Sequence, residues 1–224
     1  MNATGNCPSL LCPVAYLHFC LTARPPDFHS KGNRPPWMLP ARGKYTSRET
    51  LRVASRAGLP HIRFPPNFMA RSNSVPALRA LHFVKAKYPT AVFLTTLRFF
   101  FHAFWTPPHA EVSNADSVAD ILRSCPAAFN EAGELGEGKL FTETDVAGIM
   151  AGAAGEMKDS VRKETDAVVA QGAFGAPWMC VKNRQGKEDF FFGSDRFVYV
   201  YDHLGLPVRG VELLEAGGTG STKL

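Results

Sequence analysis

Helical periodicity dominates the middle of this chain and stops after Gln171, where two short segments rich in aromatic and β-branched residues begin. Trp178–Lys182 and Glu188–Phe192 predict two strands, and Asn183–Gly186 between them predicts the tight turn of a β-hairpin. A closing helix through Leu204 is expected to follow. The predicted pattern is thus a long helical middle that leads into a β-hairpin and one last helix.

Start and stop signals divide the helical middle into separate helices. Thr46 and Glu49 have the spacing of a capping box and predict a helix start. Residues 125–141 have no apolar period and predict an exposed loop. The segment from Thr90 carries an aromatic stripe up to Trp105, which indicates core packing or a subunit interface. The predicted helices begin near Thr46, Ser74, Thr90, Ser113, Thr142 and Lys158.

The size and composition of the chain limit its class. Its 224 residues, 45% of them hydrophobic, suffice for one domain or for a domain with a large insertion. No apolar run reaches the roughly 18 residues of a membrane span, so we expect a soluble chain. The net charge of +5 mildly favours anionic ligands. Because the basic residues are scattered along the sequence without a block of like charges, we do not expect nucleic-acid binding.

The cysteines argue against redox or zinc chemistry. The five are Cys7, Cys12, Cys20, Cys125 and Cys180. No two of them have the C-x-x-C spacing of zinc sites and dithiol oxidoreductases. We therefore expect no metal and no dithiol pair, and an oxidising compartment is not implied.

Gly172–Pro177, directly before the first predicted strand, is the most informative short segment. A proline that begins a strand after glycines favours a cis peptide bond between Ala176 and Pro177. Such a turn would leave the backbone N–H and C=O of Ala176 free to pair with an extended peptide. The alternative is an ordinary structural turn.

Three motifs occur in a fixed order around the helical block: Gly32-Asn33-Arg34-Pro35-Pro36, Gly172–Pro177 and Gly193-Ser194-Asp195-Arg196. Together they resemble the kappa-class glutathione transferases, which share a superfamily with bacterial disulfide oxidoreductases and 2-hydroxychromene-2-carboxylate isomerases. The resemblance implies an α/β, thioredoxin-like domain with a large inserted all-helical domain. The implied divisions are 1–45 for a partial N-terminal part of the thioredoxin-like domain, 46–158 for the helical insertion, 159–208 for the C-terminal part and 209–224 for a flexible tail.

The resemblance implies a set of glutathione contacts. Asn33 would hydrogen-bond glutathione or hold the loop that covers it. Arg42 falls where the family has a basic residue near the ligand carboxylate, although a solvated surface charge is an equal reading. Ala176, beside a cis Pro177, would give two backbone hydrogen bonds to the cysteinyl unit.

The same resemblance assigns the other end of glutathione to the segment after the hairpin. Ser194 would hold the γ-glutamyl carboxylate and Asp195 its ammonium group, at a helix N-terminus that favours an anion. Arg196 would reach a ligand carboxylate or a neighbouring subunit. Plain helix capping by Ser194 or Asp195 is the alternative.

The catalytic group of the family has no counterpart that we can locate. In kappa-class enzymes a serine in a Ser-Pro-Tyr-like stretch donates to the glutathione sulfur and stabilises its thiolate. No such stretch occurs here, and Ser9 is a poor substitute because no strand precedes it. If Val14–Leu21 is the second strand, the first strand and most of the first helix do not fit before it. Either the true start lies upstream, or this is a short form that has lost the chemistry.

The function implied is glutathione binding, with conjugation to small electrophiles or reduction of peroxides. The alternatives are a truncated paralogue that binds glutathione or a partner without catalysis, and a glutathione-dependent isomerase of the 2-hydroxychromene-2-carboxylate type. The family implies a homodimer with glutathione as co-substrate. Thr222-Lys223-Leu224 resembles a peroxisomal address, which favours the peroxisome, with the mitochondrion and the cytoplasm as alternatives.

Overall fold

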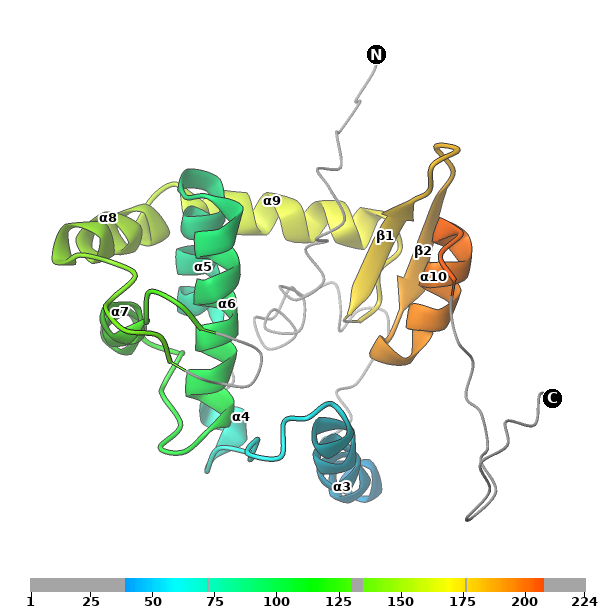
Figure 1. Cartoon of the computed structure of the whole chain (residues 1–224), viewed down its shortest axis with the longest axis horizontal. Coiled ribbons are helices and arrows are strands. Elements are labelled where there is room, and N and C mark those ends of the chain that lie inside the picture. Colours follow the sequence, from blue (N-terminus) through cyan, green and yellow to red (C-terminus); the bar gives the residue numbers. More distant parts are fainter. Residues whose placement is uncertain (1–38, 72, 130–134, 176, 208–224) are drawn as a thin grey trace. The chain divides into compact units, whose positions relative to one another are not determined.

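The computed structural model describes residues 39–71, 73–129, 135–175 and 177–207. These residues form two compact units, 39–175 and 177–207, which we call the helical unit and the hairpin unit (Figure 1). Of the sequence-based expectations, those on Asn33, on Ala176 and on the tail from residue 209 lie outside the described residues.

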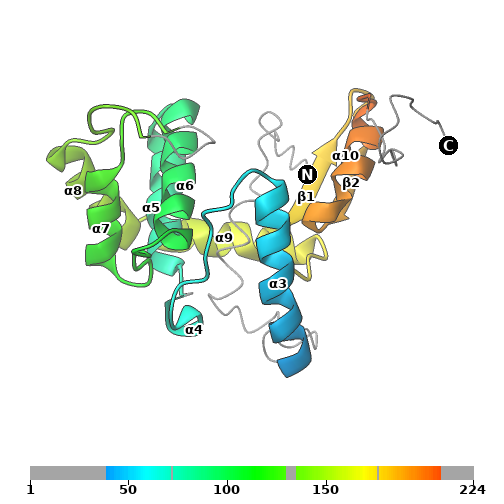
Figure 2. The same ribbon diagram turned by 60° about the horizontal axis from the view of Figure 1, so that its bottom comes forward.

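The helical unit is a bundle organised around one central helix. Its elements are α3 (Pro40–Arg56), α4 (Phe68–Arg71), α5 (Val75–Lys87), α6 (Thr90–Trp105), α7 (Ala115–Ser124), α8 (Glu143–Ala154) and α9 (Met157–Ala170). Helix α5 packs against α6, α7, α8 and α9, and Figure 2 shows it inside this group. Its position explains its sequence, since Ala77, Leu78, Ala80, Leu81, His82 and Val84 are all buried.

Large apolar side chains from four helices fill this core. Leu78 of α5, Phe100 of α6, Leu122 of α7 and Ile149 of α8 have at most 1% of their surface exposed. Burial of each such side chain stabilises the fold by about 1.5–3 kcal/mol. Gly152 of α8 lets that helix approach α5 closely, because a Cβ atom there would overlap the ring of Phe83.

Helix α8 begins as its sequence predicts. The Thr142 hydroxyl accepts the Asp145 N–H at 3.2 Å, and the Asp145 carboxylate accepts the Thr142 N–H at 2.9 Å. Tyr88, at the end of α5, donates to the same carboxylate at 2.9 Å. The hydrogen bonds from Thr142 and then Tyr88 lower the pKa of Asp145. Burial and the contact with Asp145 raise the pKa of Tyr88 to about 12.

Two predicted helix starts are wrong. Helix α3 begins at Pro40, so the capping box expected at Thr46 lies inside the helix. Proline at the first position suits a helix start because its fixed φ is already helical. Helix α7 is capped by Asn114, whose side chain accepts the Ser117 N–H at 2.8 Å, and Ser113 stands one residue too early.

The expectation for residues 125–141 is only partly correct. The described parts of this segment, 125–129 and 135–141, are irregular, but Pro126 pairs with Lys139 and Phe129 with Leu135 in isolated antiparallel bridges. Cys125 and Phe129 are buried in the core. Phe141, at the other end of the segment, is buried as well, so both ends of the loop are anchored to the bundle.

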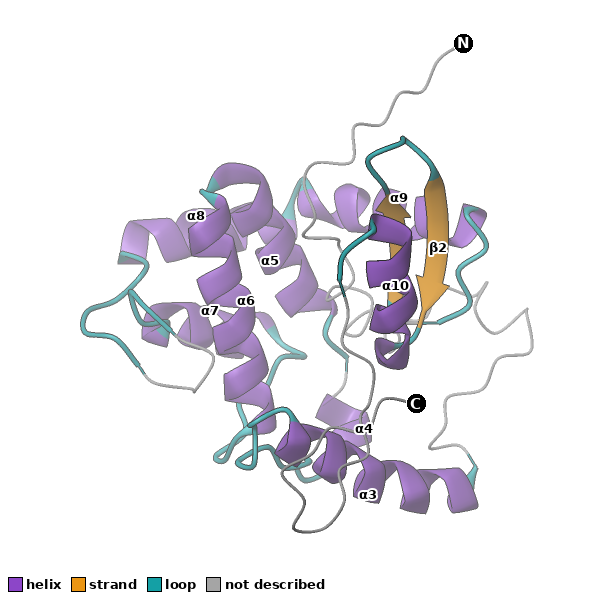
Figure 3. Cartoon of the chain, turned by 45° about the vertical axis from the view of Figure 1, so that its right-hand side comes forward, coloured by secondary structure: helices purple, strands orange, loops and turns teal. Residues whose placement is uncertain are grey.

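The two strands of the hairpin unit match their predicted ranges residue for residue. Strands β1 (Trp178–Lys182) and β2 (Glu188–Phe192) are antiparallel, with Trp178 opposite Phe192. The Asn183 side chain closes the turn by accepting the N–H groups of residues 185 and 187. A short 3-10 helix, η2 (Ser194–Arg196), leads into α10 (Phe197–Leu204), which packs on both strands (Figure 3).

No described helix has the length and apolar character that a membrane span requires.

Candidate functional site

The hairpin brings the last residue of one sequence motif, Pro177, beside the start of another, Gly193–Arg196. Because Trp178 pairs with Phe192, the residues just outside this pair also lie opposite each other. The Gly193 N–H donates to the Pro177 C=O at 3.0 Å. The structure thus places the start of β1 beside the Gly193–Arg196 segment.

Gly193 allows the chain to turn from β2 into η2. Its φ of 102° lies in the region that side chains disfavour. The Arg196 N–H donates to the Gly193 C=O at 3.3 Å and closes the short helical turn. A glycine is thus the residue type that this turn requires. It places the turn of residues 193–196 directly at the end of β2.

Asp195 and Arg196 form an ion pair at this turn. The Arg196 guanidinium donates to the Asp195 carboxylate at 2.7 Å, and the two side chains are 50% and 70% exposed, respectively. Arg196 stands at the N-cap of α10 without a side-chain hydrogen bond, so the cap predicted for Asp195 is not formed there. The Asp195 carboxylate binds a neighbouring cation instead of the helix end. An adjacent, exposed pair of this kind contributes about 0–1 kcal/mol.

Arg42 lies in the other unit, exposed near the start of α3. Its predicted contact with a ligand carboxylate therefore stays a prediction, as do the roles of Asn33 and Ala176.

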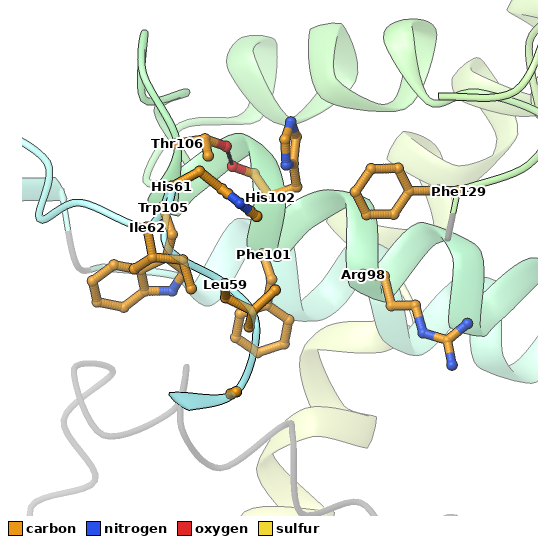
Figure 4. Close-up of a pocket in the computed structure, with 10 residues that line it drawn as sticks. Leu59, His61, Ile62, Arg98, Phe101, His102, Trp105, Thr106 and Phe129 are labelled. Carbon is orange, nitrogen blue, oxygen red and sulfur yellow. Dashed lines mark hydrogen bonds between the residues drawn. The ribbon is translucent and has the colours of Figure 1, made fainter. Parts of the chain in front are cut away.

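The helical unit contains a pocket of about 440 Å³, a size that suits a small organic ligand. Side chains from the segment after α3, from α6 and from the loop before α8 form its walls. They belong to Ala57, Leu59, His61, Ile62, Arg98, Phe101, His102, Trp105, Thr106 and Phe129 (Figure 4). The walls are mostly apolar and aromatic, with few polar groups.

Four residues with polar side chains line this pocket: His61, Arg98, His102 and Thr106. The rings of His61 and His102 have their centres 6.0 Å apart, and the Arg98 guanidinium points away from them (Figure 4). Burial lowers the pKa of His102, and the charge of His61 lowers it further. His102 Nδ1 is buried without a hydrogen-bond partner in the described structure. His102 is thus neutral at neutral pH, with a proton on Nε2 as the less costly tautomer.

The cysteines that the structure describes do not form a redox pair. Cys125 is fully buried, and burial raises the pKa of its thiol to about 12 although a hydrogen bond with Thr96 acts against this shift. Cys180 lies on β1, 3.2 Å from the Glu188 carboxylate. A thiol that stays protonated is a poor nucleophile. Among the residues described, no three His, Cys, Asp or Glu side chains gather as metal ligands would.

A sequence profile of the DSBA-like thioredoxin domain matches residues 12–205. The chain belongs to this family. The predicted fold class, a thioredoxin-like α/β domain with an inserted helical domain, is thereby confirmed. The proposed domain boundaries stay a prediction, and α3 runs across the one set at residue 46.

Kappa-class glutathione transferases are among the relatives of this DsbA-like chain. It is 28% identical to "Glutathione s-transferase kappa 2" of Caenorhabditis elegans over 81% of its own length and 75% of that protein. It is 26% identical to "Glutathione S-transferase kappa 1" of Homo sapiens, over 78% and 71% of the two chains. The resemblance stated from the three motifs is confirmed.

Sequence reasoning missed the pocket of the helical unit. The aromatic stripe of α6 divides into two faces, because Phe99, Phe100 and Phe104 are buried whereas Phe101 and Trp105 line the pocket. The core interpretation is confirmed for the buried face. The four-residue step from Phe101 to Trp105 was the signal that a second face existed.

Proposed function

We propose that this chain binds glutathione through the hairpin unit and, like a kappa-class transferase, conjugates it to small electrophiles or uses it to reduce peroxides. The observation that carries this proposal is the hydrogen bond between Gly193 and Pro177, which sets the Gly193–Arg196 segment beside the start of β1. The kappa names of three relatives agree with it.

Asp195 is suited to hold the ammonium group of the γ-glutamyl end. Its carboxylate is mostly exposed and already binds a cation, the guanidinium of Arg196. Since an exposed pair of neighbours contributes little, a ligand ammonium can take the place of Arg196 at small cost. Arg196 is then released toward a ligand carboxylate.

The chemistry would belong to the glutathione sulfur. In conjugation, the thiol loses its proton, the thiolate forms an S–C bond with the electrophile, and the leaving group departs with its electron pair. In peroxide reduction, two glutathione thiols supply two electrons, and the products are glutathione disulfide, an alcohol and water. The part proposed for this chain is to orient the tripeptide on Ala176, Ser194 and Asp195.

Thermal unfolding with and without millimolar glutathione tests the binding step. Specific binding at about 100 times Kd adds about 2.7 kcal/mol to the stability of the native state. Asp195→Asn should reduce the rise in Tm, because it removes the anion that faces the ammonium group. Asp202→Asn is the matched control, since Asp202 is an exposed carboxylate on the same C-terminal segment. A Tm that glutathione leaves unchanged contradicts the proposal.

A second candidate is a glutathione-dependent isomerase that acts on an aromatic substrate. The aromatic pocket walls formed by Phe101, Trp105 and Phe129 favour it. The test is direct: incubation with a 2-hydroxychromene-2-carboxylate and glutathione would give an isomer in place of a glutathione conjugate. A conjugate with chloronitrobenzene-type electrophiles and no isomerisation would support the transferase.

We also propose a peroxisomal location on the basis of Thr222-Lys223-Leu224, which lies outside the described residues. A fluorescent protein fused to the N-terminus of the chain should enter peroxisomes, and deletion of the last three residues should abolish this import. Equal distribution of both forms would contradict the proposal.

A further inference from the structure

The excess positive charge of the chain is concentrated on one helix. The whole chain has a net charge of +5, and α3 alone carries five basic side chains against one carboxylate. This 17-residue helix thus accounts for a net charge of +4, and the remainder of the chain is almost balanced. The basic residues look scattered along the sequence, but the helix gathers them.

Four of these basic residues follow one another at intervals of four positions. They are Lys44, Arg48, Arg52 and Arg56, and we call the surface they form the basic face. Residues four apart lie on the same side of an α-helix, with a rise of about 6 Å between them. The basic face therefore extends over about 18 Å along α3, which Figure 2 shows as one straight helix.

The basic face is exposed, and no carboxylate among the described residues neutralises it. All four side chains are exposed, and none takes part in an ion pair within the part of the chain that the structure describes. The one carboxylate of α3, Glu49, accepts a hydrogen bond from Tyr45 and so raises the pKa of that phenol. Repeated like charges four residues apart oppose helix formation. An anionic partner would remove this repulsion.

Apolar side chains border the basic face. Residues seven positions apart lie on the same side of a helix, two turns from each other. Leu51 is therefore on the same side as Lys44, and Tyr45 is on the same side as Arg52. Leu51 is 41% exposed and Tyr45 is 58% exposed. Phosphates of a nucleic acid would use only the charges. A lipid surface would also cover the leucine and place the phenol at headgroup level.

We propose that α3 binds the surface of membranes that contain anionic lipids, with the basic face toward the headgroups. A helix that lies on a bilayer needs no membrane span, and a flat surface lets all four charges engage at once. This function is additional to the proposed binding of glutathione and involves a different unit of the chain. Arg42 stands outside the four-residue series and is not needed for it.

Sedimentation of the full chain with lipid vesicles tests the proposal. The chain should pellet with vesicles of phosphatidylcholine and phosphatidylserine, remain in solution with phosphatidylcholine alone, and be released by high salt. Arg48→Gln combined with Arg52→Gln should weaken binding about 30-fold, because each basic residue at such a surface contributes about fivefold. Arg184→Gln combined with Lys187→Gln removes the same charge from the exposed hairpin turn and should leave binding unchanged.

Three results would overturn the proposal. The first is that the wild-type chain fails to pellet with the phosphatidylserine vesicles at low salt. The second is that the R48Q/R52Q variant pellets as well as the wild type does. The third is that a DNA duplex binds the wild-type chain more tightly than these vesicles do, which would assign the basic face to nucleic acid. Both double variants replace exposed residues, and their circular dichroism spectra should match that of the wild type.

Discussion

The two units of this chain differ in how they use their apolar residues. The helical unit buries its large side chains in a continuous core around α5. In the hairpin unit, Met179 and Val200 are the buried hydrophobic side chains of the described segment, whereas Phe190, Phe197 and Tyr199 are at least 41% exposed. The helical unit therefore contains its own source of stability, whereas the described part of the hairpin unit leaves most of its aromatic residues exposed.

The largest effect is expected from removal of a core ring. Phe100→Ala should cost about 3–5 kcal/mol, because Phe100 is fully buried and leaves a cavity. Phe197→Ala in the hairpin unit should cost about 1 kcal/mol or less, because that ring is 44% exposed. Urea unfolding followed by circular dichroism measures both. Equal losses of unfolding free energy in the two variants would contradict the proposed difference between the units.

Two glycines of α8 should respond in opposite directions. Gly152→Ala should destabilise the chain by about 1–3 kcal/mol, because the new methyl group overlaps the ring of Phe83. Gly148→Ala should stabilise it by about 0.5–1 kcal/mol, because nothing lies within 4 Å of the new Cβ atom. The pair is compared by thermal unfolding. Destabilisation by both variants would mean that close packing is not confined to the α5–α8 contact.

The helix caps give a smaller contrast. Thr142→Ala should cost about 1 kcal/mol, because it removes the hydroxyl that accepts the Asp145 N–H at the start of α8. Arg196→Ala should change stability by less than about 0.5 kcal/mol, because Arg196 caps α10 without a side-chain hydrogen bond. Chemical unfolding at neutral pH gives both values, and an equal loss from both would show that α10 depends on its N-terminus as α8 does.

The smallest expected effect is a pH dependence within the helical unit. Burial lowers the pKa of His82, while the Glu164 carboxylate, 3.6 Å away, raises it and Lys85 lowers it. A histidine whose pKa is lowered on folding destabilises the native state as pH falls through and below about 6.5, because the unfolded chain then takes up more protons. Glu164→Gln should steepen this loss.

Unfolding measured between pH 7.5 and about 5 follows this histidine. Glu156→Gln is the control, since Glu156 pairs with the exposed Lys87 and should leave the slope as it is. A flatter profile for Glu164→Gln would mean that the carboxylate does not favour the charged imidazole.

The hairpin and most helices could be predicted because their signals are local. Aromatic and β-branched residues and the Asn183–Gly186 turn define both strands, and Pro89 separates α5 from α6. The start of α3 was mispredicted because two start signals compete, and the φ of Pro40 prevails over the Thr46–Glu49 spacing. The carboxylate of Glu49 serves Tyr45 instead.

The candidate sites also divide into one that a local pattern predicts and one that depends on packing between distant residues. The position of Gly193 beside Pro177 follows from strand register, which the hairpin pattern already contains. The pocket could not be predicted because His61 and His102 are far apart in the sequence and meet only through packing. The complete basic face of α3 follows from its four-residue spacing only when the helix begins at Pro40, because a start at Thr46 leaves Lys44 outside the helix.

Alkylation of the Cys125 thiol can report how often the core of the helical unit opens. It is fully buried, and its pKa of about 12 keeps it protonated, so an alkylating reagent can modify it only while the core is open. Cys180 of the hairpin unit is partly accessible in the native state. Mass spectrometry of the two labelled peptides would thus time the opening of one unit in the intact chain, with the other thiol as an internal reference for reagent activity.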